Sequence, residues 1–222
     1  MSRLLRGTCA AALVVIALVL VACGSDDSES TTTTSSGCQE VGAPPPKDVE
    51  LAAPKASAPT ASGVTFETSC GSFTVSFDDR APKTAASFQY LAEKGFFDET
   101  VFHRVVPGFV IQGGDPLGSS TDPSVVGTGG PGYFVDEEPP RNLAYTEGTV
   151  AMAKTDAEPR GRSGSQFYVV TAADAGLTPD FALVGEVTSG METVEAIEAL
   201  GQPGGDGPPS MPVVIERATT ED

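Results

Sequence analysis

Apolar and polar residues alternate along residues 64–77, on either side of the pair Cys70-Gly71. A period of two predicts a β-hairpin with one buried face. Further short apolar segments predict strands at residues 109–112, 149–153, 166–171, 182–187 and 212–217. Residues 82–95 and about 191–200 show helical spacing instead, and a glycine closes each of them. Many short strands with two helices indicate an all-β barrel or sandwich.

The chain begins with a different pattern. Arg3 and Arg6 precede an apolar stretch that is shorter than the roughly 20 residues a membrane-spanning helix needs. It therefore predicts a secretory signal at residues 1–22. The tetrapeptide Leu20-Val-Ala-Cys23 resembles a bacterial lipobox, which implies acylation of Cys23 and a lipid anchor on the extracytoplasmic face of the cell membrane. The alternative is an ordinary cleaved signal that happens to contain a cysteine.

Residues 24–62 are dominated by Ser, Thr, Asp, Ala and Pro. Such a segment has too little apolar surface to offset the entropy lost on ordering. We therefore expect residues 23–62 to form a disordered spacer that starts at the lipidated cysteine. Residues 63–222 are long enough to bury a core of their own and are predicted to form one domain.

The charge limits the partners. The full chain carries a formal net charge of −17, and loss of residues 1–22 removes two basic and no acidic residues, which leaves −19. So acidic a surface repels nucleic acid and anionic lipid headgroups. We expect no nucleic-acid partner, membrane contact through the lipid anchor only, and a monomer.

The cysteines are few. Of the four, Cys9 lies in the signal and Cys23 is the predicted lipid site, which leaves Cys38 and Cys70. Outside the cytoplasm such a remaining pair is more often a disulfide than two free thiols. With one histidine and no Cys-x-x-Cys, the sequence predicts no metal site and no cofactor.

The most informative segment is residues 102–115, which places an arginine, a glutamine and two phenylalanines in an apolar, strand-like run. Two further blocks follow in order, the glycine loop 127–130 and the pair Met152-Ala153 with Gly-Ser-Gln-Phe-Tyr at 164–168. Together they resemble the cyclophilins, a family of peptidyl-prolyl cis/trans isomerases. The resemblance covers residues 63–217 and implies a closed eight-stranded antiparallel barrel capped by two α-helices.

The resemblance also implies a site. Rotation about an X-Pro bond breaks no covalent bond, so catalysis requires a group that favours the twisted amide over both planar ones. Arg104 would donate a hydrogen bond to the prolyl nitrogen, Gln112 would orient Arg104, and Phe109 would line the proline pocket. The other substrate-binding residues that the resemblance implies are His103, Val110, Gly127, Thr128, Met152, Ala153, Lys154, Gln166, Tyr168 and Leu177.

The sequence departs from the family in several places. It has no tryptophan, and Gly176 stands where many members carry one, which argues against cyclosporin binding. Phe181 replaces a common histidine or tyrosine, and Val110 replaces a frequent methionine. The stretches 116–126 and 154–163 are longer than in compact members.

Two functions remain open at this stage. The first is a prolyl isomerase that accelerates folding of exported proteins at the cell envelope. The second is a module that binds proline-containing segments or a fixed partner, with little turnover. A separate alternative for Arg104 alone is an ordinary surface arginine paired with a carboxylate. The presence of both Arg104 and Gln112 favours the enzyme, because a binding module has no need to stabilise a twisted amide.

Overall fold

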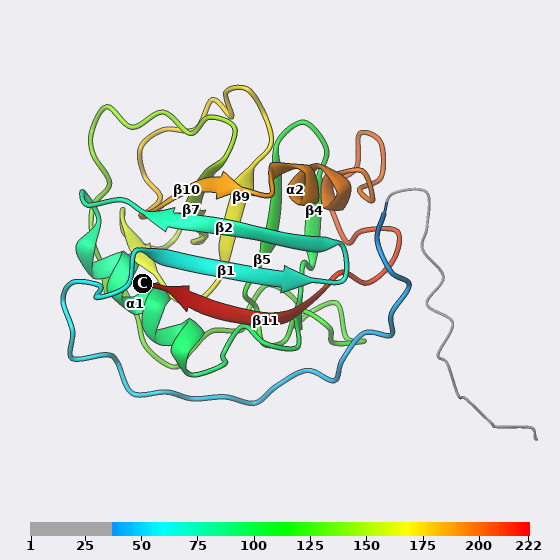
Figure 1. Cartoon of the computed structure of the whole chain (residues 1–222), viewed down its shortest axis with the longest axis horizontal. Helices are drawn as coiled ribbons and strands as arrows, with labels where there is room; N and C mark the ends of the chain where they lie inside the picture. Colours follow the sequence, from blue (N-terminus) through cyan, green and yellow to red (C-terminus); the bar gives the residue numbers. More distant parts are fainter. Residues whose placement is uncertain (1–36) are drawn as a thin grey trace, which may run out of the picture. The chain divides into compact units, whose positions relative to one another are not determined.

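The structure is a computed structural model that describes residues 37–222 (Figure 1). The predicted signal, Cys23 and the first part of the predicted spacer lie outside the described residues. The strands are β1 (Gly63–Thr68), β2 (Gly71–Phe77), β3 (Thr100–Val101), β4 (Arg104–Val106), β5 (Val110–Gly113), β6 (Val135–Asp136), β7 (Thr149–Met152), β8 (Arg162–Ser163), β9 (Phe167–Val170), β10 (Leu183–Ser189) and β11 (Val214–Glu221). The helices are α1 (Pro82–Glu93) and α2 (Met191–Glu198).

Nine strands form one antiparallel sheet in the order β3-β11-β1-β2-β10-β7-β9-β5-β4. The sheet curls, so that β1, β2 and β11 lie in front of β5 and β9 in Figure 1. Its two edge strands belong to one extended segment, which pairs with β11 before Phe102 and with β5 after His103. The expected closed eight-stranded barrel is not confirmed, because nine strands pair and no ladder joins β3 to β4 within the described residues.

Phenylalanines fill the inside of the curled sheet. The rings of Phe66, Phe88 and Phe167 lie 5.2–5.9 Å apart, and all three are fully buried. Alternation along each strand places every second residue inside, as with Ile111 of β5, and sends its neighbours to the outer face. This outer face of β4, β5, β7 and β9 carries the candidate site.

Residues 38–62, which we call the strap, run along the surface of the domain without helix or strand (Figure 1). The backbone N–H groups of Lys47 and Leu51 donate to the carbonyl oxygens of Pro116 and Pro131, each at 2.8 Å. Val49 and Leu51 pack against the core. The strap therefore lies against the domain, in contrast to the free spacer that its composition predicts.

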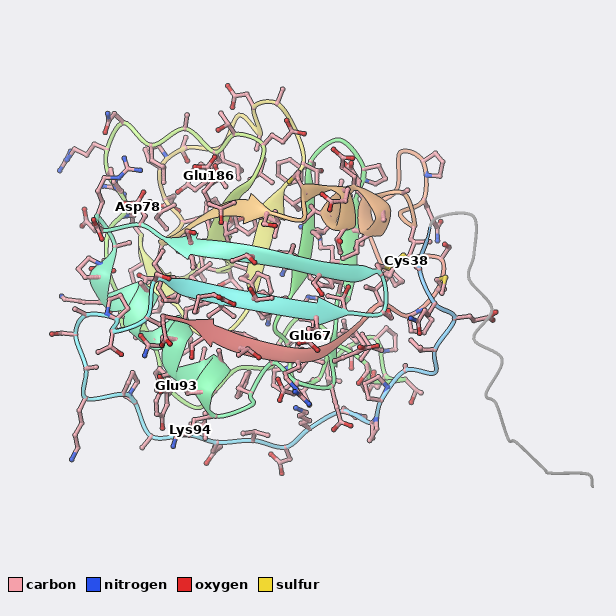
Figure 2. All side chains as sticks on the ribbon, viewed as in Figure 1. Cys38, Glu67, Asp78, Glu93, Lys94 and Glu186 are labelled. Atoms are coloured by element: carbon pink, nitrogen blue, oxygen red, sulfur yellow. A yellow bond between two sulfur atoms is a disulfide. The ribbon has the colours of Figure 1, made fainter. Side chains whose placement is uncertain are left out.

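A disulfide joins Cys38, at the start of the strap, to Cys70 in the turn between β1 and β2. Figure 2 shows Cys38 at the end of the molecule where the described chain begins. These are the two cysteines that the sequence analysis pairs. Within residues 37–222, no helix is both long and apolar enough to cross a membrane.

Candidate active site

Three adjacent strands bring the predicted polar residues together. Arg104 of β4 lies opposite Gln112 of β5, and Gln112 lies opposite Tyr168 of β9. Directly opposed residues in antiparallel strands project from the same face. A row of three side chains that are far apart in the sequence therefore crosses the outer face of the sheet.

Hydrogen bonds fix the orientation of these side chains. Arg104 Nη1 donates to Gln112 Oε1 at 3.1 Å, and Gln112 Nε2 donates to Gln166 Oε1 at 3.2 Å. Gln166 Nε2 in turn donates to the carbonyl oxygens of Gly127 and Gly129, each at 2.9 Å. The glycine loop thus determines which way both amides point, and with them one edge of the guanidinium.

Arg104 has a second partner that the sequence did not single out. Its Nε donates to Asp206 Oδ1 at 2.6 Å and its Nη2 donates to Asp206 Oδ2 at 2.8 Å. The Arg104 side chain is 31% exposed and that of Asp206 is 62% exposed. A guanidinium has five N–H groups, so these contacts and Gln112 leave two of them for another acceptor. Arg104 is therefore paired with a carboxylate and also lies within the predicted site.

An apolar cluster lies beside this row. Its buried members are Val110, Tyr145, Ala151, Tyr168 and Val170, and Phe109, Leu143, Ala153, Ala172, Ala175, Leu177 and Phe181 pack against it partly buried. Of the predicted site residues, Phe109, Val110, Ala153, Tyr168 and Leu177 belong to this cluster. Glu198 of α2 accepts a hydrogen bond from the N–H of Gly108 at 2.7 Å, which holds the turn that carries Phe109.

Met152 does not lie in this cluster. Its side chain is 2% exposed and packs in the main core with Val150. The reason is the alternation along β7, which sends Ala151 to the outer face and Met152 inside. Ala151 takes the place at the site that the sequence analysis gave to Met152, and a strict count by two from Ala153 would have found it.

Two cavities open on either side of Gln112. One, of about 730 Å³, is lined by Gln112, Thr128, Ala153, Lys154 and Gln166, by the glycine loop, and by residues 47–50 of the strap. The other, of about 580 Å³, is lined by Ala43 of the strap, His103, Arg104, residues 118–121 and residues 207–212. The structure thus brings Thr128, Gly127 and Gln166 to one wall, and the strap adds residues that the sequence assigned to a spacer.

Two predicted substrate-binding residues expose little of their side chains. The Lys154 side chain is 4% exposed, and its ammonium pairs with Asp180 at 2.6 Å. His103 is buried, and its ring lies near the backbone of Val101. Burial lowers the pKa of His103 below its usual range, and the nearby carboxylate of Asp115 opposes this only in part. The imidazole is therefore neutral at pH 7 and supplies no charge to the site.

Comparison with known proteins identifies the family to which this fold belongs. The family model described as cyclophilin type peptidyl-prolyl cis-trans isomerase/CLD matches residues 63–220. The chain is a cyclophilin-type peptidyl-prolyl cis-trans isomerase.

Fungal and bacterial proteins are among its relatives. This cyclophilin is 32% identical over 167 residues to peptidyl-prolyl cis-trans isomerase-like 1 of Aspergillus oryzae, covering 73% of this chain and 98% of that protein. It is 40% identical over 161 residues to peptidyl-prolyl cis-trans isomerase B of Streptomyces anulatus, covering 64% and 86%. A crystal structure of a Cryptosporidium parvum cyclophilin in the presence of the dipeptide Ala-Pro is 28% identical, with a TM-score of 0.62, and the match covers 72% of this chain and 99% of that one.

The two tyrosines of the apolar cluster differ in their hydrogen bonds. The hydroxyl of Tyr145 donates to the carbonyl oxygen of Phe181 at 2.6 Å, and burial raises the pKa of Tyr145 to about 12. The hydroxyl of Tyr168 is buried without a hydrogen-bond partner, and burial raises the pKa of Tyr168 well above its usual range. Both phenols therefore stay neutral at pH 7.

Within residues 37–222, no group of three or more His, Cys, Asp or Glu is arranged to hold a metal ion.

Proposed function

We propose that Arg104 carries the isomerase activity of this cyclophilin, with Gln112 and the apolar cluster around Phe109 as its support. The observation behind this proposal is the position of the guanidinium, which is fixed by hydrogen bonds beside the cluster while two N–H groups stay available. The barrier to rotation about an X-Pro bond is roughly 18–20 kcal/mol and arises from amide resonance. When resonance is lost, the prolyl nitrogen becomes an acceptor, and an N–H of Arg104 donates to it only in that state.

The cluster and the cavities have separate roles in this mechanism. The proline ring packs on Phe109, Val110 and Leu177, which removes apolar surface from water and holds the ring while the amide turns. The cavity beside the glycine loop receives the residue before proline, and Gln112 hydrogen-bonds the peptide backbone. No residue transfers a proton, so His103 contributes to the wall of the site and not to acid-base chemistry.

We expect the protein to accelerate isomerisation of Ala-Pro peptides at a rate that does not change between about pH 6 and 8. An unperturbed histidine titrates near pH 6.5, burial lowers the pKa of His103 below that, and the isomerisation requires no proton transfer from this group. The measurement is kcat/KM from a protease-coupled assay at several pH values. A loss of activity centred near pH 6.5 would contradict the uncharged role of His103, and no turnover on any X-Pro peptide would favour the binding module instead.

We further propose that this isomerase acts on exported proteins at the extracytoplasmic face of the cell membrane. The lipobox-like Leu20-Val-Ala-Cys23 supports an anchor, and the disulfide of the folded domain supports an oxidising compartment. We expect the wild type to fractionate with membranes and Cys23→Ala to be released, since a chain without acyl groups lacks the apolar anchor. Immunoblots of both fractions decide the question. Equal release of both proteins would remove the anchor from the proposal.

A further inference from the structure

The loop between α2 and β11 lies against β4, the strand that carries Arg104. The N–H of Val105 donates to the carbonyl oxygen of Gly207 at 2.7 Å, so this part of the loop pairs with β4. A side-chain carbon added at Gly201 would lie only 2.7 Å from Pro107 and 2.8 Å from Val105, so this close approach requires glycine. The loop therefore has a defined position beside β4, and Asp206 directly precedes its paired residue.

Asp206 binds one edge of the Arg104 guanidinium through both carboxylate oxygens. The carboxylate accepts from Nε and Nη2 in a two-pronged contact, and Gln112 accepts from Nη1. Parallel hydrogen bonds of this kind fix the plane of a guanidinium as well as its position. The guanidinium hydrogen bond holds the pKa of Asp206 below its usual range, so the carboxylate is ionised at neutral pH.

The carboxylate has two opposing effects on Arg104. It partly neutralises the positive charge, which weakens the hydrogen bond to the prolyl nitrogen, and it orients the donors, which strengthens that bond. Both side chains are open to solvent, where attraction between charges is screened and contributes little to stability. The directional effect is therefore the larger one.

We propose that Asp206 is a positioning residue for the isomerisation, and that it aims the free N–H groups of Arg104 at the prolyl nitrogen without touching the peptide. This inference rests on the proposed role of Arg104. It predicts an effect on kcat with little effect on KM, because orientation of the donor matters in the twisted state and less in the bound planar peptide.

The chain offers a matched control. Asp136 makes the same two-pronged contact with Arg162, at 2.8 and 2.9 Å, and the two side chains are 59% and 33% exposed. Asp206→Asn and Asp136→Asn therefore remove equivalent exposed carboxylates, one at the catalytic arginine and one at an arginine outside the row of site residues.

The test measures kcat and KM for an Ala-Pro peptide by NMR exchange at rising peptide concentration, for wild type and both variants. We expect Asp206→Asn to lower kcat about tenfold with KM within about twofold of wild type, and Asp136→Asn to change neither. The ¹⁵N-arginine spectrum should show the Nε–H of Arg104 exchanging faster with water in Asp206→Asn only, at an unchanged melting temperature.

Wild-type or higher kcat in Asp206→Asn would overturn the inference. A fall in kcat accompanied by a fall in melting temperature that Asp136→Asn does not show would overturn it as well, because it would indicate a structural role. An inactive wild type would overturn the proposed role of Arg104, and the role of Asp206 with it. An active wild type with an inactive Arg104→Ala and an unaffected Asp206→Asn would remove only the role of Asp206.

Discussion

Replacing Arg104 by alanine is expected to lower kcat/KM by about 10²–10³ while the protein stays folded. Removing a preorganised donor that acts in the transition state typically has an effect of this size. The side chain is 31% exposed and its ion pair is open to solvent, so its loss leaves no buried charge behind. The measurement is the coupled assay together with a thermal melt.

Two further variants sharpen this test. Arg104→Lys should recover little activity, because a single ammonium cannot hold Asp206 and Gln112 and still present a planar pair of donors. Arg162→Ala, which removes an arginine with the same kind of carboxylate contact, should be fully active. Wild-type acceleration by a folded Arg104→Ala protein would show that another group carries catalysis.

Removing the disulfide is expected to lower the free energy of unfolding by about 3–4 kcal/mol. The bridge closes a loop of sequence separation 32, and a loop of this length restricts the unfolded chain by about that amount. A Cys38→Ser, Cys70→Ser double variant and the wild type should be compared by urea denaturation, each with and without reductant. Reductant should destabilise the wild type and leave the double variant unchanged. Equal stability of all four samples would mean that the strap does not depend on the bridge.

Short apolar segments predicted β5 and β9, and antiparallel pairing then placed Arg104 opposite Gln112 and Gln112 opposite Tyr168. The period-two pattern predicted the hairpin of β1 and β2, because one face of each strand is buried. The same pattern, counted strictly along β7, would have sent Met152 into the core and Ala151 to the site. That error came from assigning a conspicuous side chain ahead of its position in the alternation.

Other parts of the structure could not follow from local pattern. Asp206 lies 102 residues from Arg104 in a loop of glycine and proline that has no periodicity, so only the tertiary pairing of Gly207 with Val105 reveals it. The strap has few large apolar residues, and composition predicts it to be free. It is ordered because the backbone of Lys47 and Leu51 finds acceptors in the loop at 116–131, which is a property of the partner and not of the segment.

The disulfide also determines where mechanical load would enter the domain. If Cys23 is fixed in a membrane as proposed, a pull on the tether reaches Cys38 and passes through the bridge to the turn between β1 and β2, which spares the strap. The chain from Cys23 to Cys38 is then the whole tether, and it spans at most about 50 Å when fully extended. Reduction would shift the point of load to the strap, and its contacts with the domain through Lys47, Val49 and Leu51 would then have to bear the pull before β1 does.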